Sequence, residues 1–208
     1  MIRHVKRMRL PVLCMLVGIG SFLFSQSQTQ VGYTLLSADS GTSVPVGTAL
    51  FTYTNQQGIL VSQAGVAAAE PIFSGRIFVD QDGTETGIAL VNPSQQKASI
   101  TLILRDSSGT EVARQNLSLD PGNHLAGFVS QFFTNLQTGF TGTLTFESSQ
   151  KLGAITLRLT KNAENEDLYA TLSVIDLSSP ASSDSIVFPQ IAAGGGYSTQ
   201  LILINSTT

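Results

Sequence analysis

The residues best suited to chemistry in this sequence are the carboxylates of one short run, Asp80-Gln-Asp-Gly-Thr-Glu85. Asp80, Asp82 and Glu85 would offer hard oxygen ligands, which Ca²⁺ prefers. The spacing departs from an EF-hand loop, because a further acidic position before the glycine and the distal glutamate are both absent. The same run is also typical of a solvated turn between two strands. A calcium site at Asp80, Asp82 and Glu85 is therefore a hypothesis that stands beside this structural interpretation.

Other residues that could carry chemistry form weaker patterns. Glu164, Glu166 and Asp167 make a second acidic cluster, but like charges on a hairpin tip more often keep a strand edge soluble than bind a metal. His124 follows Asp120 across a Pro-Gly turn, and the sequence contains no G-x-S-x-G, H-E-x-x-H, C-x-x-C or P-loop motif. We therefore expect no catalytic residue, no cofactor apart from the hypothetical calcium, and no enzymatic activity.

The segments that carry these residues alternate in the way typical of β-strands. Ile100, Leu102 and Leu104 place three aliphatic side chains on one face of a strand. Leu157 is expected to point into the same core from a later strand. Turn residues such as Pro93 and Gly109 separate the runs. The predicted strands are residues 32–36, 47–54, 59–63, 76–79, 86–91, 100–105, 112–119, 124–128, 141–147, 153–160, 169–177 and 199–205.

One short helix interrupts the strands. Phe128, Phe132, Phe133 and Leu136 fall on one helical face, and one or two turns of helix are expected to cap the open end of the fold. The charged fraction is 12%, against about 25% in an average soluble protein, and Ser and Thr replace the charges of helical surfaces. We predict an all-β fold, an antiparallel immunoglobulin-like β-sandwich with a short capping helix, flanked by partial repeats.

The first 27 residues have the order of a secretory signal peptide. Four basic residues come first, residues 10–24 are almost wholly apolar, and Ser25-Gln-Ser27 offers small residues for cleavage. The apolar run is shorter than the about 20 residues of a membrane span, and an uncleaved N-terminal anchor is the alternative. Cys14, the only cysteine, lies inside this run. The sequence predicts a secreted or cell-surface protein without disulfides.

Charge narrows the classes of partner. Without the leader, seven Lys and Arg remain against 14 Asp and Glu, which gives the mature chain a net charge of −7. An acidic surface without a basic run disfavours binding to nucleic acid or to an anionic membrane. Extracellular polysaccharide and cell-surface protein remain as possible partners.

Parts of the chain recur at a long interval. Residues 199–205 match residues 86–92, and the matching Asn92 and Asn205 lie 113 residues apart. More weakly, residues 49–54 match residues 154–160. Such a period suits an immunoglobulin-sized module better than a solenoid repeat. The predicted domains are a signal peptide at 1–27, the end of a partial repeat with a linker at 28–70, a sandwich at 71–184, and the opening strands of an incomplete repeat at 185–208.

Several of these motifs resemble one bacterial family. They are Gly87-Ile-Ala-Leu-Val-Asn-Pro-Ser94, Leu119-Asp-Pro-Gly-Asn-His-Leu-Ala126, Gly139-Phe-Thr-Gly-Thr-Leu144 and Val187-Phe-Pro-Gln-Ile-Ala-Ala-Gly-Gly-Gly-Tyr197. They are similar to tandem β-sandwich repeats of secreted or surface proteins, largely uncharacterised, over roughly residue 48 to the C-terminus. The resemblance implies export and modular architecture, and it supplies no catalytic residue.

Three hypotheses for function follow. The first is a secreted or cell-surface, non-catalytic module with a structural or adhesive role. The second is a carbohydrate-binding module. Two observations weaken this hypothesis: the sequence contains no Trp, and its four tyrosines are scattered along the chain, at Tyr33, Tyr53, Tyr169 and Tyr197. The third is an accessory domain of a hydrolase. We expect the two end fragments to pair within the chain, either with each other or with the central domain, and self-association between chains through edge strands is the alternative.

Overall fold

The computed structural model describes residues 31–180 and 183–206, so the predicted signal peptide lies outside the described residues. The chain divides into two compact units, Met1–Val46 and Gly47–Thr208. In the first unit, the predicted strand at 32–36 is wrong, because residues 31–39 have no regular secondary structure. The predicted domain borders at 27, 70 and 184 stay predictions.

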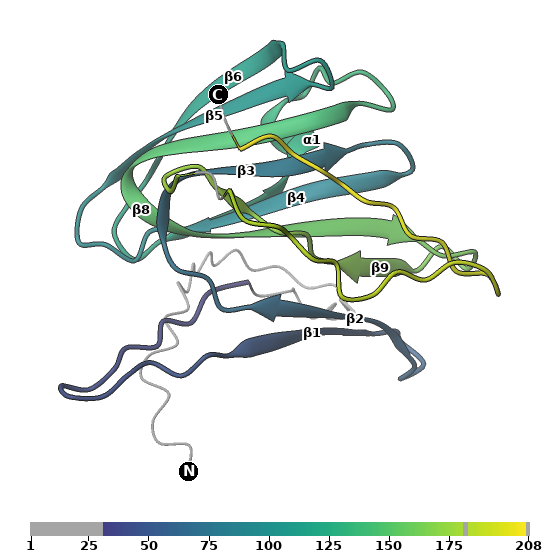
Figure 1. Ribbon diagram of the computed structural model, residues 1–208, viewed down its shortest axis with the longest axis horizontal. Coiled ribbons are helices and arrows are strands. Elements are labelled where there is room, and N and C mark those ends of the chain that lie inside the picture. The colour runs from purple at the N-terminus through teal and green to yellow at the C-terminus, as the bar shows by residue number, and fades with distance from the viewer. Residues whose placement is uncertain (1–30, 181–182, 207–208) are drawn as a thin grey trace, which may run out of the picture. The chain divides into compact units, whose positions relative to one another are not determined.

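The second unit consists of antiparallel strands and one helical turn, which confirms the predicted all-β, sandwich-like fold class (Figure 1). Its elements are β1 (Thr48–Thr54), β2 (Leu60–Ala67), β3 (Ile72–Asp80), β4 (Thr84–Val91), β5 (Ala98–Asp106), β6 (Glu111–Leu119), β7 (His124–Phe128), α1 (Val129–Phe132), β8 (Thr141–Lys161), β9 (Asp167–Ala170) and β10 (Ile175–Asp176). Among the described residues, no helix is long and apolar enough to cross a membrane.

The long strand β8 holds the two layers together. Its first half pairs with β3 on one side and β5 on the other, and its second half pairs with β4 and β9. One layer therefore runs β10-β3-β8-β5-β6, and the other runs β7-β4-β8-β9. The sequence predicted two strands, 141–147 and 153–160, whereas the structure has one strand of 21 residues. It passes from one layer to the other near the polar residues Ser148 and Gln150.

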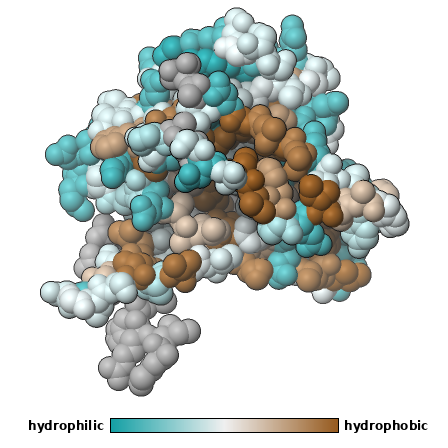
Figure 2. Space-filling view, viewed as in Figure 1, coloured by the Kyte–Doolittle hydropathy of each residue, from teal (hydrophilic) through white to brown (hydrophobic). Residues whose placement is uncertain are grey.

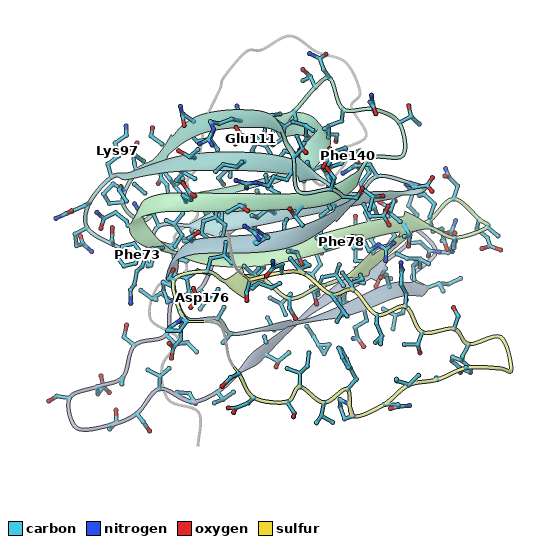
Figure 3. The ribbon with its side chains drawn as sticks, turned by 45° about the horizontal axis from the view of Figure 1, so that its top comes forward. Phe73, Phe78, Lys97, Glu111, Phe140 and Asp176 are labelled. Carbon is cyan, nitrogen blue, oxygen red and sulfur yellow. The ribbon has the colours of Figure 1, made fainter. Side chains whose placement is uncertain are left out.

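The core lies between these layers. Ile77, Leu144 and Phe146 of the first layer are fully buried there with Leu102, whose predicted position in the core is confirmed. In Figure 3, β3 runs from Phe73 near one end of the sandwich towards Phe78 near the other. Burial of a large aliphatic or aromatic side chain contributes about 1.5–3 kcal/mol, so this cluster supplies a large part of the folding free energy.

The predicted inward position of Leu157 is wrong. Opposite residues of an antiparallel pair share a face, and the buried Ile88 lies opposite Thr156, while Leu157 lies opposite Gly87. Leu157 is therefore on the outer face of its layer, together with Tyr169, which lies opposite Leu159. Alternation indicates which residues share a face, and it does not say which of the two faces is the inner one.

The predicted capping helix is a single turn, α1. Val129 and Phe133 are buried in the core, and Phe132 and Leu136 pack against it. Phe133 donates its backbone N–H to the carbonyl of Val129 at 3.0 Å. Phe132 and Phe133 thus contribute to the core as expected, and the single turn agrees with the predicted one or two turns.

Asn92 ties the β4–β5 turn to the β6–β7 turn and is completely buried. Its Nδ2 donates to the carbonyls of Gln96 at 2.7 Å and Leu119 at 3.0 Å. Its Oδ1 accepts from the backbone N–H and the hydroxyl of Ser94, at 3.1 and 2.7 Å. Because both ends of the amide are bonded, its burial is compatible with a stable fold.

The C-terminal segment, residues 183–206, forms no strand, so the predicted strand at 199–205 is wrong. It lies against β3, where the guanidinium of Arg76 donates to the carbonyl of Asn205 at 2.7 Å and to the hydroxyl of Thr145 at 3.0 Å (Figure 1). Burial, together with the nearby charge of Arg105, lowers the pKa of Arg76. Many apolar side chains of this segment are exposed, and apolar residues gather on the face shown in Figure 2.

Candidate functional site

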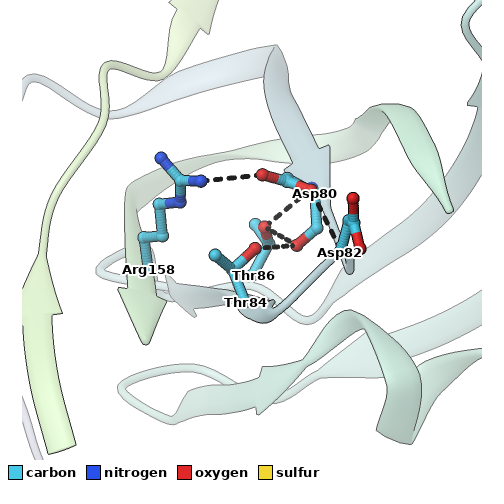
Figure 4. Close-up of polar contacts among 5 residues, drawn as sticks. All are labelled: Asp80, Asp82, Thr84, Thr86 and Arg158. Atoms are coloured by element: carbon cyan, nitrogen blue, oxygen red, sulfur yellow. Dashed lines mark hydrogen bonds and ion pairs between the residues drawn. The ribbon is translucent and has the colours of Figure 1, made fainter. Parts of the chain in front are cut away.

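The acidic run begins at Asp80, the last residue of β3, and forms a compact turn around it (Figure 4). One carboxylate oxygen of Asp80 forms an ion pair with Arg158 at 2.7 Å, and the other accepts the backbone N–H of Asp82 at 3.0 Å. The hydroxyls of Thr84 and Thr86 donate to the Asp80 carbonyl at 2.8 and 3.1 Å. Both side-chain oxygens and the carbonyl of Asp80 therefore have partners within the fold.

The three predicted calcium ligands are not brought together. Glu85 is exposed and lies on the opposite face of β4 from Thr84 and Thr86, which surround Asp80. Within the described residues, no group of three His, Cys, Asp or Glu side chains is placed to hold a metal ion. Calcium binding at Asp80, Asp82 and Glu85 stays a prediction, and a rise in melting temperature at millimolar Ca²⁺ would be its direct test.

The second acidic cluster serves the hairpin between β8 and β9. Glu166 accepts from Asn55 at 2.7 Å and from Asn162 at 3.0 Å, and these bonds lower the pKa of its carboxyl. Asp167 pairs with Lys161 and accepts the hydroxyl of Tyr169 at 3.2 Å. These contacts orient the tip of the hairpin and link it to the turn that follows β1.

An aromatic cluster joins the β1–β2 hairpin to β9. The rings of Phe51 and Tyr53 both meet Tyr169 edge to face, with centroids 6.3 Å apart in each pair. Ser62 of β2 secures the contact, because its hydroxyl accepts the backbone N–H of Tyr169 at 2.7 Å. Burial, then the nearby charge of Asp167, raises the pKa of Tyr169.

Sequence reasoning missed this cluster. Tyr53 and Tyr169 lie 116 positions apart, so along the sequence they look like scattered aromatic residues. The weak match between residues 49–54 and residues 154–160 was the one available signal for this contact. Residues 158–161 pair with β9, the strand of Tyr169, so a segment that resembles residues 154–160 could be expected to lie near β9 as well. Phe51 and Tyr53 remain exposed enough to meet a ligand, with exposed fractions of 50% and 37%. Asp167 and Glu166 place polar groups next to them.

A shallow groove lies beside the end of β2. It has a volume of about 330 Å³ and adjoins a second hollow of about 260 Å³, since Ala69, Ala154 and Val174 line both. The walls are mostly small aliphatic and Thr side chains, and Glu70 and Asp176 add two carboxylates to the second hollow. Ligand sites usually combine apolar walls with a few convergent polar groups, and this groove meets that description less well than the aromatic cluster.

The remaining sequence candidate, His124, begins β7 and lies opposite Val91 in the ladder with β4. It is half-buried at the edge of the second layer. Asp120 forms an ion pair with Lys97 at 3.2 Å. The structure thus gives Asp120 a surface partner other than His124.

Comparison with known proteins adds one distant likeness. No family model matches the chain, and no curated protein matches it. The crystal structure of Thermotoga maritima 1070 is similar to 54% of this chain and to 100% of its own, with 12% identity and a TM-score of 0.44. A likeness at this level carries no argument about the fold or the function.

Proposed function

We propose that this protein is a secreted or cell-surface, non-catalytic β-sandwich module with a structural or adhesive role. The observation that carries the proposal is the apolar surface of the β1–β2 hairpin. Leu50 and Phe51 are at least half exposed on the two opposite faces of β1, and Leu60 of the paired strand is more than half exposed. Large apolar side chains that stay exposed on both faces of a hairpin offer surface that an interaction partner can cover.

Two sequence features support the extracellular location. The basic start and the short apolar run of residues 1–27 are typical of a signal peptide. The family resemblance of residues 87–94 and 187–197 implies tandem modules in exported bacterial proteins. Both features agree with the acidic net charge of the chain and with its β-rich composition.

Export is tested by expressing the full chain in a bacterial host with a C-terminal tag. The intact mass of the exported protein should lack residues 1 to about 27. Leu16→Arg, which places a charge inside the apolar run, is the matched control and should keep the protein inside the cell. Retention of the unaltered chain in the cytoplasm at full mass would overturn the proposed location.

Carbohydrate binding is the second candidate, and the aromatic cluster is the observation that favours it. Exposed aromatic faces can pack against the apolar face of a sugar ring, and neighbouring carboxylates can accept hydrogen bonds from its hydroxyls. Phe51 and Tyr53 lie two residues apart on one strand, beside Asp167 of the facing hairpin.

A glycan array with the exported protein separates the two candidates. Saturable binding that Tyr53→Ala abolishes, and that Tyr197→Ala leaves intact, would establish the carbohydrate function. Tyr197 is the matched control because it is exposed and belongs to the C-terminal segment, outside the aromatic cluster. Binding that both variants retain would exclude the cluster as the site.

A further inference from the structure

Two segments of this chain have the properties of unprotected edge strands. β1 pairs with β2 on one side, and no ladder among the described residues uses its other edge. All seven of its residues are exposed, and none of them is charged or proline. Natural edge strands usually carry such residues to prevent pairing with other chains. The edge strand β6 does so, with an ion pair between Glu111 and Arg114 at 2.8 Å.

The second segment is Thr199–Asn205, which also lacks charge and proline. Its counterpart by sequence is β4, where Ile88 and Leu90 are 3% and 1% exposed because β7 and β8 flank the strand. The corresponding Leu201 and Leu203 are 48% and 72% exposed. This segment therefore has the side chains of a central strand without the neighbours of one.

The sandwich itself shows which partner such a segment would fit. β4 pairs antiparallel with the second half of β8 over Thr84–Val91. The run Gly47-Thr-Ala-Leu-Phe-Thr-Tyr-Thr54, which contains β1, resembles Gly153-Ala-Ile-Thr-Leu-Arg-Leu-Thr160 of that half. Each run leads into an Asx turn and a partner strand, β2 in one case and β9 in the other. The β5–β6 hairpin closes with the same kind of turn, so the turn alone does not distinguish these two runs. The correspondence between β1 and the second half of β8 therefore rests on the strand sequences and on the order of the strands.

We infer that Thr199–Asn205 of one chain adds as an antiparallel strand to the free edge of β1 in a second copy. This contact would reproduce between chains the β4–β8 ladder that exists inside each sandwich. It would cover Leu201 and Leu203, and the backbone groups along β1 would gain partners. The inference deepens the proposed structural role by naming the partner as another copy of this chain.

The structure places the two segments apart within one chain. Thr199–Asn205 is held through Asn205 at Arg76, a residue of β3 in the first layer. The hairpin instead contacts β9 in the second layer, where Thr171 beyond the strand donates to the carbonyl of Gly65 at 2.8 Å. Neither segment pairs with the other in the described residues. Pairing between copies would be head to tail, which gives a ring where the rotation between copies closes and a filament where it does not.

The test uses two blocked variants of the full chain. Leu50→Lys with Thr52→Lys puts charges on the β1 edge, and Leu201→Lys with Leu203→Lys puts them on the C-terminal segment. All four side chains are exposed or half-exposed, so both variants should fold with an unchanged melting temperature. Ile186→Lys with Val187→Lys is the matched control, because these exposed apolar residues precede Thr199–Asn205.

Light scattering across a dilution series gives the readout. The unaltered chain and the control should increase in mass with concentration, and each blocked variant alone should keep the mass of a single chain at every concentration. An equimolar mixture of the two blocked variants should form a one-to-one pair and grow no further, since it holds one intact edge and one intact segment. Three results would each overturn the inference. They are a mass that still rises with concentration for either blocked variant alone, a mixture of the two that stays monomeric, and an unaltered chain that never associates. A normal export experiment beside any of these results would leave the proposed function standing.

Discussion

Removal of the Asn92 side chain should destabilise the sandwich more than any other loss of a single polar group among the described turns. In Asn92→Ala, the buried carbonyl of Leu119 loses the donor that lies 3.0 Å away. A buried acceptor left without a partner costs about 1–3 kcal/mol. The bonds to Gln96 and to the backbone N–H of Ser94 are also lost, at about 0.5–1.5 kcal/mol each.

The expected loss is therefore about 4 kcal/mol, a large part of the about 5–15 kcal/mol that stabilises a typical domain. Urea unfolding is the assay, and with a slope of about 2 kcal/mol per M the midpoint should fall by roughly 2 M without a change in slope. Asn123→Ala is the matched control, because Asn123 is an exposed turn residue that contributes its backbone carbonyl to Asn92. Its midpoint should change little.

Asn92→Asp sharpens the test, because it keeps the shape and replaces the donating amide by a carboxylate. The introduced carboxylate would face two carbonyl oxygens, so its folded-state pKa should lie above the unfolded value. The penalty is then largest at neutral pH, and it should shrink as the pH falls through the raised folded pKa towards the unfolded value near 4. A loss below about 1 kcal/mol in Asn92→Ala, or an Asn92→Asp variant without this pH dependence, would refute the reasoning.

Three further outcomes are expected. Leu102→Ala should cost about 2–5 kcal/mol in urea unfolding, and Leu157→Ala should cost clearly less, because only Leu102 belongs to the core cluster. Gly142→Ala should destabilise by at least about 1–3 kcal/mol, since the added Cβ would lie 2.1 Å from a backbone oxygen, while Gly47→Ala, which meets open space, should be neutral. Thermal melts between pH 3 and 7 should show that Glu166→Gln is less stable than the unaltered chain at neutral pH. The folded-state pKa of the Glu166 carboxyl is lowered, so the stability that this carboxylate contributes disappears as the pH falls through its folded-state pKa. The variant should therefore lose less stability than the unaltered chain below about pH 4.

Most strand positions could be predicted from the sequence, because alternation and turn residues are local signals. β7 begins and ends at the predicted residues, and β1, β4 and β6 lie within one or two residues of their predicted bounds. The continuity of β8 was not predictable in the same way. Residues 148–152 look like a turn, and they remain extended because ladder partners lie on both sides, including Ile100 opposite Ser148 and Ile72 opposite Leu152.

The candidate site was less predictable than the fold. Asp80, Asp82 and Glu85 are candidate ligands because they are close along the chain. In the structure, Glu85 lies on the face of β4 that points away from Asp80, and the carboxylate of Asp80 forms an ion pair with Arg158. The aromatic cluster depends on a contact between distant segments that no local pattern encodes. Proximity in sequence is therefore a poor guide to the surface of this fold, where most side-chain neighbours come from other strands.

The segment Thr199–Asn205 shows why a correct reading of local propensity can still give a wrong strand. Its sequence matches β4, and β4 is a strand because β7 and β8 accept and donate its backbone hydrogen bonds. An isolated strand gains none of these bonds and buries no face, so the entropy of extending it is not offset. The same residues should therefore become a strand as soon as a partner edge is present. Whether β1 of a second copy is that partner is what the mixture of blocked variants decides.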